Sequence, residues 1–193
     1  MHLEKSILSK IKKNYLKYLK SQEVLSEPFR DKNRQLNNYY LPICKNINTL
    51  YQKDKKTKII GLTGGQGSGK STISNILKII LIKGFNLNTI IFSIDDFYKK
   101  LSERKKLSKK VCNLFLTRGV PGTHDTKFLL NCLRNLKRSK FKKILIPKFD
   151  KSNDDRAPQK KWQRINKKPA IVIFEGWCVG ATAQKKKDLI API

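Results

Sequence analysis

Long hydrophobic runs are absent from this chain of 193 residues. No apolar segment reaches the roughly 18–20 residues that a membrane-spanning helix needs. The first residues, MHLEKSILSKIKKNYLKYLK, have neither a continuous apolar region nor a small-residue cleavage site, and they include Glu4, which argues against a signal or transit peptide. We therefore expect no association with membranes and a cytoplasmic location.

Acidic residues are scarce, with 14 Asp and Glu against 43 Lys and Arg, so the formal net charge is +29. So basic a composition is typical of proteins that bind nucleic acid or another polyanion. Most of these basic residues are lysines spread over the whole chain, however, and no RNA-binding pattern interleaves them with aromatic residues. We favour a solvated basic surface over a dedicated nucleic-acid-binding function.

Metal-ligating side chains are also few, since the chain has four cysteines and two histidines. No two cysteines form a CxxC pair, and each lies in an apolar context: Cys44, Cys112, Cys132 and Cys178. This pattern argues against a structural zinc site. It predicts free, buried thiols.

Apolar residues recur at helical spacing between Leu3 and Leu19, which predicts an amphipathic helix. Further helical segments are predicted after it. We interpret residues 1–52 as an N-terminal helical extension that packs on a main domain, and residues 53–193 as that domain.

From Lys58 onward the pattern changes to short apolar runs rich in β-branched residues. Strands are predicted in KIIGLT, LNTIIFSID, KKILIPKF and PAIVIFEG, and helices in STISNILKIILIKG and HDTKFLLNCLRNLKR. Strands that alternate with helices favour an α/β fold of three layers, in which helices cover both faces of a mostly parallel sheet. The run KIIGLT suits a strand that is buried on both faces.

The stretch GLTGGQGSGKST, residues 61–72, contains five glycines and one charged residue, Lys70. It includes GxxxxGK[ST] in full, between a predicted strand and a predicted helix. Glycines let backbone N–H groups surround phosphate oxygens, and the helix start adds its positive end. Lys70 can reach the β- and γ-phosphates, and the Ser71 hydroxyl can ligate Mg²⁺. The residues predicted to bind ATP are Gly64, Gly65, Gln66, Gly67, Ser68, Gly69, Lys70, Ser71 and Thr72.

Two adjacent carboxylates, Asp95 and Asp96, follow the second predicted strand. In an open α/β sheet, that edge faces the ligand crevice. A carboxylate placed there can accept the proton of a substrate hydroxyl as the hydroxyl attacks the γ-phosphate. The structural alternative for this pair is a helix cap or a salt bridge.

Five segments occur in the order GLTGGQGSGKST, SIDDFY, TRGVPGTHDT, IPKFDKSNDDR and IVIFEGWCVG. Together they resemble the D-glycerate 3-kinase family, within the P-loop kinases that include uridine kinase, phosphoribulokinase and pantothenate kinase. The resemblance covers residues from about 55 to 193. The phosphate loop alone is generic, but RGVPGTHD, FDKS..DR and FEGW in combination are specific. The resemblance implies ATP-dependent phosphorylation of a small acid, D-glycerate, to 3-phosphoglycerate.

The resemblance also implies roles for single residues. Asp95 looks like the general base and acts in catalysis with Lys70, while Glu175 looks like the acidic partner of Mg²⁺, beside Ser71. Arg118 suits a small carboxylate, because a guanidinium can hold a carboxylate in a bidentate fork. The implied acceptor-binding residues are Asp96, Tyr98, Arg118, His124, Asp125 and Arg156.

The residues themselves leave alternatives open. His124 could be a helix-cap or core histidine, and Arg156 could pair only with its neighbours Asp154 and Asp155. A related kinase with another acceptor, such as a nucleoside or pantothenate, is a competing functional hypothesis. A non-catalytic nucleotide-binding protein is another.

The family continues beyond its FEGW segment with a further strand, an arginine-bearing lid and the loop that holds adenine, whereas this chain ends at KKKDLIAPI. We therefore expect an incomplete kinase domain. Lid arginines neutralise charge in phosphoryl transfer and lid closure excludes water, so we expect slow or undetectable turnover by residues 1–193. The sequence predicts no oligomeric state.

Overall fold

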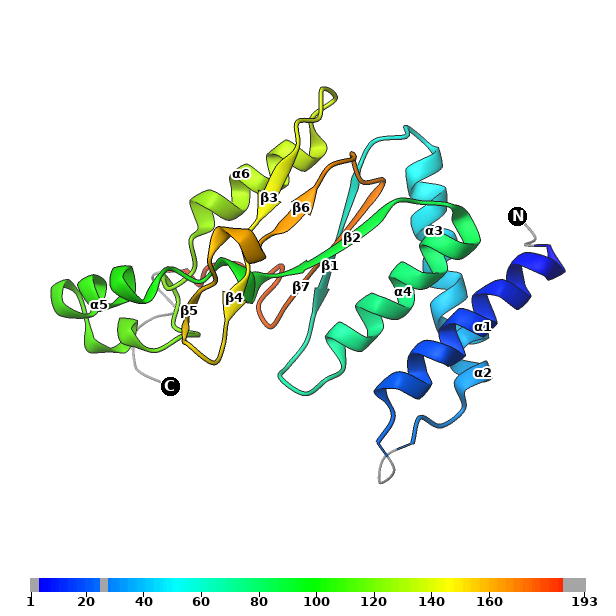
Figure 1. Cartoon of the computed structure of the whole chain (residues 1–193), viewed down its shortest axis with the longest axis horizontal. Coiled ribbons are helices and arrows are strands. Elements are labelled where there is room, and N and C mark those ends of the chain that lie inside the picture. Colours follow the sequence, from blue (N-terminus) through cyan, green and yellow to red (C-terminus); the bar gives the residue numbers. More distant parts are fainter. Residues whose placement is uncertain (1–3, 25–27, 186–193) are drawn as a thin grey trace.

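The computed structural model describes residues 4–24 and 28–185. A parallel sheet of three strands lies at its centre, in the order β1 (Lys58–Thr63), β7 (Ile171–Gly176) and β2 (Thr89–Ser93) (Figure 1). All residues of β7 are buried, because a strand pairs with it on each side and other elements cover both of its faces. The central parallel sheet agrees with the predicted α/β class.

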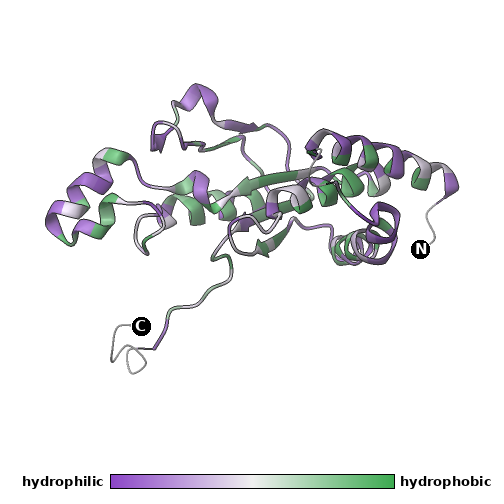
Figure 2. Ribbon diagram, turned by 90° about the horizontal axis from the view of Figure 1, so that it is seen from below, coloured by the Kyte–Doolittle hydropathy of each residue, from purple (hydrophilic) through white to green (hydrophobic). Residues whose placement is uncertain are grey.

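The described residues also form helices and short helical turns. They are α1 (Lys5–Gln22), α2 (Lys32–Gln35), the π-helical turn η1 (Leu36–Tyr40), α3 (Leu41–Gln52), α4 (Lys70–Phe85), α5 (Leu101–Lys110) and α6 (Thr126–Lys137), with 3-10 turns η2 (Ile94–Phe97), η3 (Asn113–Leu116) and η4 (Gln159–Lys161). Figure 2 shows that hydrophobic residues concentrate in the central strands.

The side chains of β7 alternate between two hydrophobic cores, as the two-residue period of a strand requires. Ile171 and Ile173 belong to the first core, together with residues of α1, α3 and α4. Val172 and Phe174 belong to the second core, together with residues of α6 and β2. The sheet is therefore the middle of three layers.

The N-terminal helices share the first core with α4. Ile11, Tyr15 and Leu19 of α1 are buried there, at the spacing that predicted this helix. The thiol of Cys44 in α3 lies 3.7 Å from the carbonyl oxygen of Leu77 in α4. The helices that precede β1 therefore pack against the same helix that follows the phosphate loop.

The prediction that β1 is buried on both faces is wrong. Its residues are half-buried or exposed, because β1 lies at an edge of the three-stranded sheet and only β7 pairs with it among the described residues. The fully buried strand is β7.

The prediction that KKILIPKF joins the parallel sheet is also wrong. It contains β3 (Ile144–Ile146), which pairs antiparallel with β6 (Gln163–Ile165). Pro147 ends β3 after three residues, since proline has no N–H to donate to a ladder. The chain then forms a second antiparallel pair, β4 (Phe149–Asp150) with β5 (Asp155–Arg156).

The four cysteines are free, as predicted, but only two of them are buried. Burial raises the pKa of the Cys132 thiol to about 11, and it also raises the pKa of Cys44. Cys112 is exposed and Cys178 is half-buried, so the prediction of burial is wrong for these two.

No helix in the described parts of the chain combines the length and apolarity that a membrane crossing requires.

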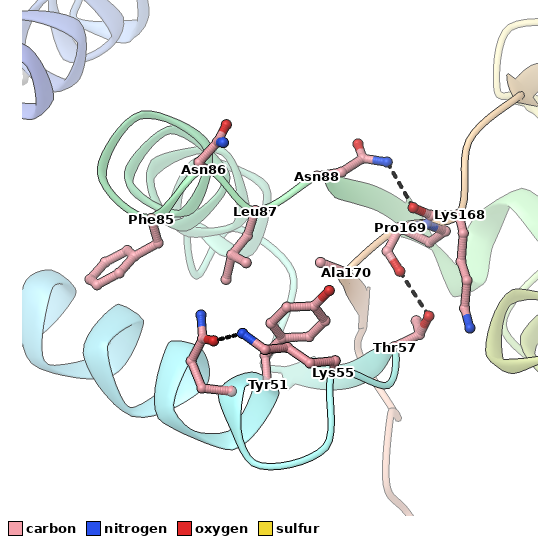
Figure 3. A pocket seen from close by; sticks show the side chains of 11 residues that line it. Tyr51, Lys55, Thr57, Phe85, Asn86, Leu87, Asn88, Lys168, Pro169 and Ala170 are labelled. Carbon is pink, nitrogen blue, oxygen red and sulfur yellow. Dashed lines mark hydrogen bonds between the residues drawn. The ribbon is translucent and has the colours of Figure 1, made fainter. Parts of the chain in front are cut away.

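A hollow of about 460 Å³ lies where the strands begin, remote from their carboxyl ends (Figure 3). Thr57 Oγ1 donates to the carbonyl of Pro169 at 2.8 Å, and Asn88 Nδ2 donates to that of Lys168 at 3.1 Å. These bonds fasten together the segments that enter the three strands. The hollow therefore lies at the opposite end of the sheet from the phosphate loop.

Candidate active site

The glycine-rich loop, residues 64–69, connects the end of β1 to the start of α4 (Figure 1). Gly67 and Gly69 have φ angles of 77° and 78°, in the left-handed region that glycine adopts without strain. A Cβ atom on Gly64 would lie 2.7 Å from Ser68 Oγ. The loop conformation therefore explains why three of its positions are glycine.

Lys70 and Ser71 occupy the first turn of α4. Lys70 Nζ reaches back over the loop and donates to the carbonyl of Gly65 at 2.6 Å. The helix start and the loop present backbone N–H groups and a positive partial charge at one place. This is the arrangement that binds the phosphates of a nucleotide.

Ser71 and Glu175 meet across the sheet edge. Ser71 Oγ donates to Glu175 Oε1 at 2.9 Å and lies 3.2 Å from Oε2, while the Glu175 side chain comes from the buried end of β7. A hydroxyl and a carboxylate are oxygen ligands of the kind that Mg²⁺ prefers, and Mg²⁺ commonly takes its other ligands from phosphates and water. The two residues therefore fit a shared Mg²⁺ site.

No group of three or more His, Cys, Asp or Glu side chains in the described ranges could hold a metal ion.

Asp96 has the contacts of the structural alternative, a helix cap and a salt bridge. Its Oδ2 accepts from Ser93 N at 3.3 Å, while Ser93 Oγ accepts from Asp95 N at 3.2 Å, which forms a capping box around η2. Asp96 also accepts from Lys148 Nζ at 2.8 Å and from Phe149 N at 3.3 Å. Both of its oxygens are thus used to fix the turn after β2. The Asp96 side chain therefore has a structural role, as a helix cap and as a salt-bridge partner of Lys148.

Asp95 has a different environment from Asp96. Its Oδ2 lies 3.1 Å from Lys151 Nζ, and about a quarter of its side chain is exposed (28%). Ser93, two residues before it, pairs in register with Glu175. Asp95 is therefore placed at the same end of the sheet as the Ser71–Glu175 contact, with a carboxylate that solvent or a ligand can reach.

Four of the predicted acceptor-binding residues form one cluster beside η2. The rings of Tyr98 and His124 stack with centroids 4.1 Å apart and an interplanar angle of 22°. Arg156 Nη2 donates to the carbonyl of Tyr98 at 2.9 Å and lies 3.3 Å from Asp125 Oδ2. Asp125 also caps α6 by accepting from Phe128 N at 3.1 Å. Arg156 therefore pairs with Asp125, and not with Asp154 or Asp155 as in the sequence alternative.

Two nitrogen atoms in this cluster are buried without a protein partner. These atoms, His124 Nε2 and Arg156 Nε, accept or donate no hydrogen bond to any residue that the structure describes. Burial lowers the pKa of His124, and the Asp95 carboxylate only partly opposes this shift. His124 is therefore neutral near pH 7, and its Nε2 is enclosed by the protein. Burial also raises the pKa of Tyr98, which keeps its phenol protonated.

Arg118 lies beside this cluster. Its Nε is 2.8 Å from Asp154 Oδ1, and its guanidinium lies 5.2 Å from the centroid of the Phe149 ring. The Phe149 ring in turn meets Tyr98 edge-on, with centroids 5.3 Å apart. Arg118 is about one third exposed (32%), so it is held by the protein and still reachable from solvent.

Asp150 and Lys151 begin the turn between β4 and β5. Asp150 Oδ1 accepts from Ser152 N at 3.1 Å, and Asp150 Oδ2 accepts from Asn153 Nδ2 at 3.0 Å. These bonds shape the turn. They leave Lys151 next to Asp95.

Sequence reasoning missed Arg104, a fully buried charged residue. Its Nη1 donates to the carbonyl of Leu116 at 2.6 Å, and its Nη2 donates to Asp154 Oδ2 at 2.9 Å. In the segment SERKK it looks like one more solvated basic residue. No local signal could have revealed it, because its partner Asp154 is fifty positions away.

The sequence pattern of the phosphoribulokinase / uridine kinase family matches residues 59–189, which is more than half of the chain. The chain belongs to this family. The matched residues include the phosphate loop, Asp95, the acceptor cluster and Glu175. Membership agrees with the P-loop kinase resemblance of the sequence motifs.

Two curated proteins are similar to this chain over most of its length. An uncharacterized kinase, mug58, of Schizosaccharomyces pombe is 40% identical over 129 residues, which are 63% of this chain and 46% of that protein. The chloroplastic D-glycerate 3-kinase of Arabidopsis thaliana is 29% identical over 163 residues, 76% of this chain and 36% of that protein. The chain thus spans less than half the length of these two curated relatives.

Solved structures agree with the fold. The structure of D-glycerate 3-kinase from Cryptococcus neoformans var. grubii matches with a TM-score of 0.68 and 28% identity, over 77% of this chain and 54% of that one. The similarity therefore extends to a three-dimensional structure as well as to sequence motifs.

Proposed function

We propose that this protein is an ATP-dependent phosphotransferase that acts on a hydroxyl of a small acid, D-glycerate, and forms 3-phosphoglycerate. One observation carries the proposal: a phosphate-binding loop, a reachable carboxylate and a cluster with two arginines lie at the carboxyl end of one parallel sheet. Phosphoryl transfer needs these groups in one place, since its catalysis consists mainly of positioning and charge stabilisation.

The phosphate end holds the donor. The loop N–H groups and Lys70 bind the β- and γ-phosphates, for which Lys70 exchanges its contact with the Gly65 carbonyl. Ser71 and Glu175 hold Mg²⁺, which neutralises charge on the phosphates when it is bound.

Asp95 accepts the proton of the attacking hydroxyl. It is the carboxylate after β2 that is not consumed by a cap. Lys151 orients it through their ion pair. A positioned base of this kind contributes about 10²–10⁴-fold to the rate.

Cationic and polar groups next to Asp95 bind the acceptor. Arg118 suits the carboxylate of the acid, because its planar guanidinium can form two parallel hydrogen bonds to it. Arg156 adds a second positive charge to this part of the site, where it is paired with Asp125. The combination favours a small hydroxy acid over a neutral acceptor.

An ADP-release assay with a panel of acceptors tests this function. The 193-residue chain, Mg²⁺ and ATP are incubated with D-glycerate, L-glycerate, uridine or pantothenate, or with no acceptor. We expect ADP release with D-glycerate above the rate without acceptor. Release with uridine or pantothenate alone would replace the proposed acceptor, and ATP binding without transfer to any acceptor would favour a non-catalytic nucleotide-binding protein.

A further inference from the structure

Arg104 is a charged residue that the phosphotransferase proposal does not use. Its side chain is completely buried, and burial of a charge is costly unless ion pairs and hydrogen bonds compensate for it. Arg104 donates to the carbonyl oxygens of Leu116 and Lys99, at 2.6 and 3.4 Å, and to Asp154 Oδ2 at 2.9 Å. It therefore joins both ends of the segment 99–118 to the β4–β5 turn.

Asp154 is the residue that this buried arginine holds. It has a φ angle of 49°, in the left-handed region, at the last position of the β4–β5 turn. One of its carboxylate oxygens contacts Arg104, and the other lies 2.8 Å from Arg118 Nε. The Arg118 contact is an ion pair and not an aligned hydrogen bond. Asp154 thus links a buried arginine to the reachable one.

The contact uses the inner nitrogen of the Arg118 guanidinium. Neither terminal nitrogen of Arg118 is hydrogen-bonded to a side chain or carbonyl of residues 4–24 or 28–185, where its polar contact is the one from Nε to Asp154. The guanidinium also lies over the Phe149 ring. Its orientation is therefore fixed on two sides, while the pair of nitrogens that could grip a carboxylate has no protein partner.

We propose that Asp154 is a positioning residue for acceptor binding: anchored by the buried Arg104, it holds Arg118 so that the terminal guanidinium nitrogens face an acidic acceptor. This inference rests on the proposed function, because it takes Arg118 as the group that binds the acceptor carboxylate. A guanidinium fixed in advance loses less rotamer freedom when the acid binds. The same contact, however, partly neutralises Arg118.

Orientation and neutralisation predict opposite effects of removing the charge of Asp154. If orientation dominates, the variant Asp154→Asn binds the acid more weakly. If neutralisation dominates, the same variant frees a positive charge and binds the acid more tightly. Asparagine is a suitable substitution, because it tolerates the left-handed conformation of this position.

Steady-state kinetics on the full chain separate the two. We expect Asp154→Asn to raise the KM for D-glycerate about tenfold, the size of a partly lost charge-assisted contact, and to leave the KM for ATP and kcat within about twofold. Asp54→Asn, which removes an exposed ion pair with Lys58, is the matched control and leaves all three constants unchanged. An unchanged or lower KM for D-glycerate in Asp154→Asn would overturn the proposal.

A second variant tests the proposal if Asp154→Asn fails to fold. Asp154→Glu keeps a negative charge for Arg104 but shifts it relative to Arg118, and glutamate is less suited to the left-handed conformation of this position. We therefore expect a folded protein with a slightly lower melting temperature and a raised KM for D-glycerate. A double-mutant cycle with Arg118→Lys then tests whether Asp154 acts through Arg118. Strongly non-additive effects on the KM support the proposal, and additive effects contradict it.

Side-chain NMR of ¹⁵N-arginine-labelled protein supplies a readout that needs no substrate. We expect the Arg118 Nε–H signal to be distinct in the wild type and to move toward the position of exposed arginines in Asp154→Asn. If it does not move, the positioning role is wrong, whatever the enzyme phosphorylates. If it moves but the wild type neither binds nor phosphorylates D-glycerate, the proposed acceptor is wrong and the link between Asp154 and Arg118 stands.

Discussion

The phosphate loop and the acceptor cluster lie at the same end of one sheet, but they are built in opposite ways. The loop is glycine-rich, exposed and almost free of side-chain contacts, and its lysine is bonded to a carbonyl of the loop itself. In the acceptor cluster, every predicted charged residue is paired with a residue from another segment, such as Arg156 with Asp125 and Arg118 with Asp154. In the proposed function, backbone groups bind phosphate at one place, and side chains fixed by long-range contacts bind the acceptor at the other.

The difference suggests a division of labour. A loop of N–H groups can surround any triphosphate, since it recognises charge and shape. A cluster of paired side chains can recognise one small molecule, because each partner fixes the direction of the next. Variants in the loop should therefore affect ATP, and variants in the cluster should affect the acceptor.

The largest effect is expected for Lys70→Ala. Loss of a charge-assisted contact to phosphate costs on the order of 1.5–3 kcal/mol in binding, and the same lysine stabilises charge during transfer, so turnover should become undetectable while the fold persists. Calorimetric titration with Mg-ATP and a coupled assay measure both. Lys83→Ala, at the exposed far end of α4, is the control. Unchanged affinity and rate in Lys70→Ala would remove the phosphate-binding interpretation.

Substitution of the two adjacent aspartates should lower different quantities, the turnover rate for Asp95 and the stability for Asp96. Asp95→Asn should keep ATP affinity and lower kcat by about 10²–10⁴-fold, as expected for a general base. Asp96→Asn should mainly lower the melting temperature, because its oxygens hold the turn after β2. Rate measurements and thermal unfolding on both variants test this. A severe kinetic defect in Asp96→Asn with a mild one in Asp95→Asn would reverse the assignment.

Arg118→Lys should weaken binding of the acceptor and leave binding of ATP nearly unchanged. Lysine keeps the charge but cannot form the bidentate fork, so the KM for D-glycerate should rise by about tenfold and exceed any change in the KM for ATP. Initial rates at varied concentrations of each substrate give the two constants. Equal small changes in both would identify a structural arginine and weaken the case for an acidic acceptor.

Two glycine variants compare stability with phosphate binding. A Cβ atom on Gly176 would overlap the Ile94 side chain, whereas one on Gly65 would meet nothing within 4 Å. Gly176→Ala should therefore destabilise the protein by about 1–3 kcal/mol, the usual cost of overpacking. Gly65→Ala should leave the melting temperature near wild type and weaken ATP binding. Denaturant unfolding and calorimetry distinguish the two, and equal stability losses would contradict the comparison.

The smallest effect concerns pH. Burial lowers the pKa of His124 below its ordinary value of 6.5, so the unfolded chain binds a proton at this residue more readily than the folded one. Stability contributed by neutral His124 is therefore present above pH 6.5 and is lost as the pH falls below it. Melting temperatures between pH 7.5 and 5.5 should fall less in His124→Gln than in the wild type. Parallel pH profiles would contradict the burial of a neutral imidazole.

The phosphate end could be predicted from the sequence because its determinants are contiguous. The strand KIIGLT, the glycine loop and the helix from Lys70 follow one another, and each is encoded by local propensity. The structure places Ser71 against Glu175, two residues to which the family resemblance had given a shared role. The burial of β1 was not predictable in the same way, since it depends on which strands pair with it.

The acceptor end could be predicted only in part. The motif order named Tyr98, His124 and Arg156, and the structure brings them together. The pairing of Arg104 with Asp154 could not be predicted from the sequence, because neither residue stands out locally and fifty positions separate them. The antiparallel pairing of β3 was missed for a related reason: three residues before a proline carry too little pattern to specify a partner.

Identification of the phosphorylated product tests the central claim most directly, namely that the two ends act together on a small acid. The chain is incubated with Mg-ATP and D-glycerate and followed by ³¹P NMR, with Asp95→Asn as the control. The account predicts a phosphomonoester signal coupled to two methylene protons, as in 3-phosphoglycerate, that is absent or strongly delayed in Asp95→Asn. Formation of inorganic phosphate alone, or of the same ester at equal rates in both proteins, would contradict it.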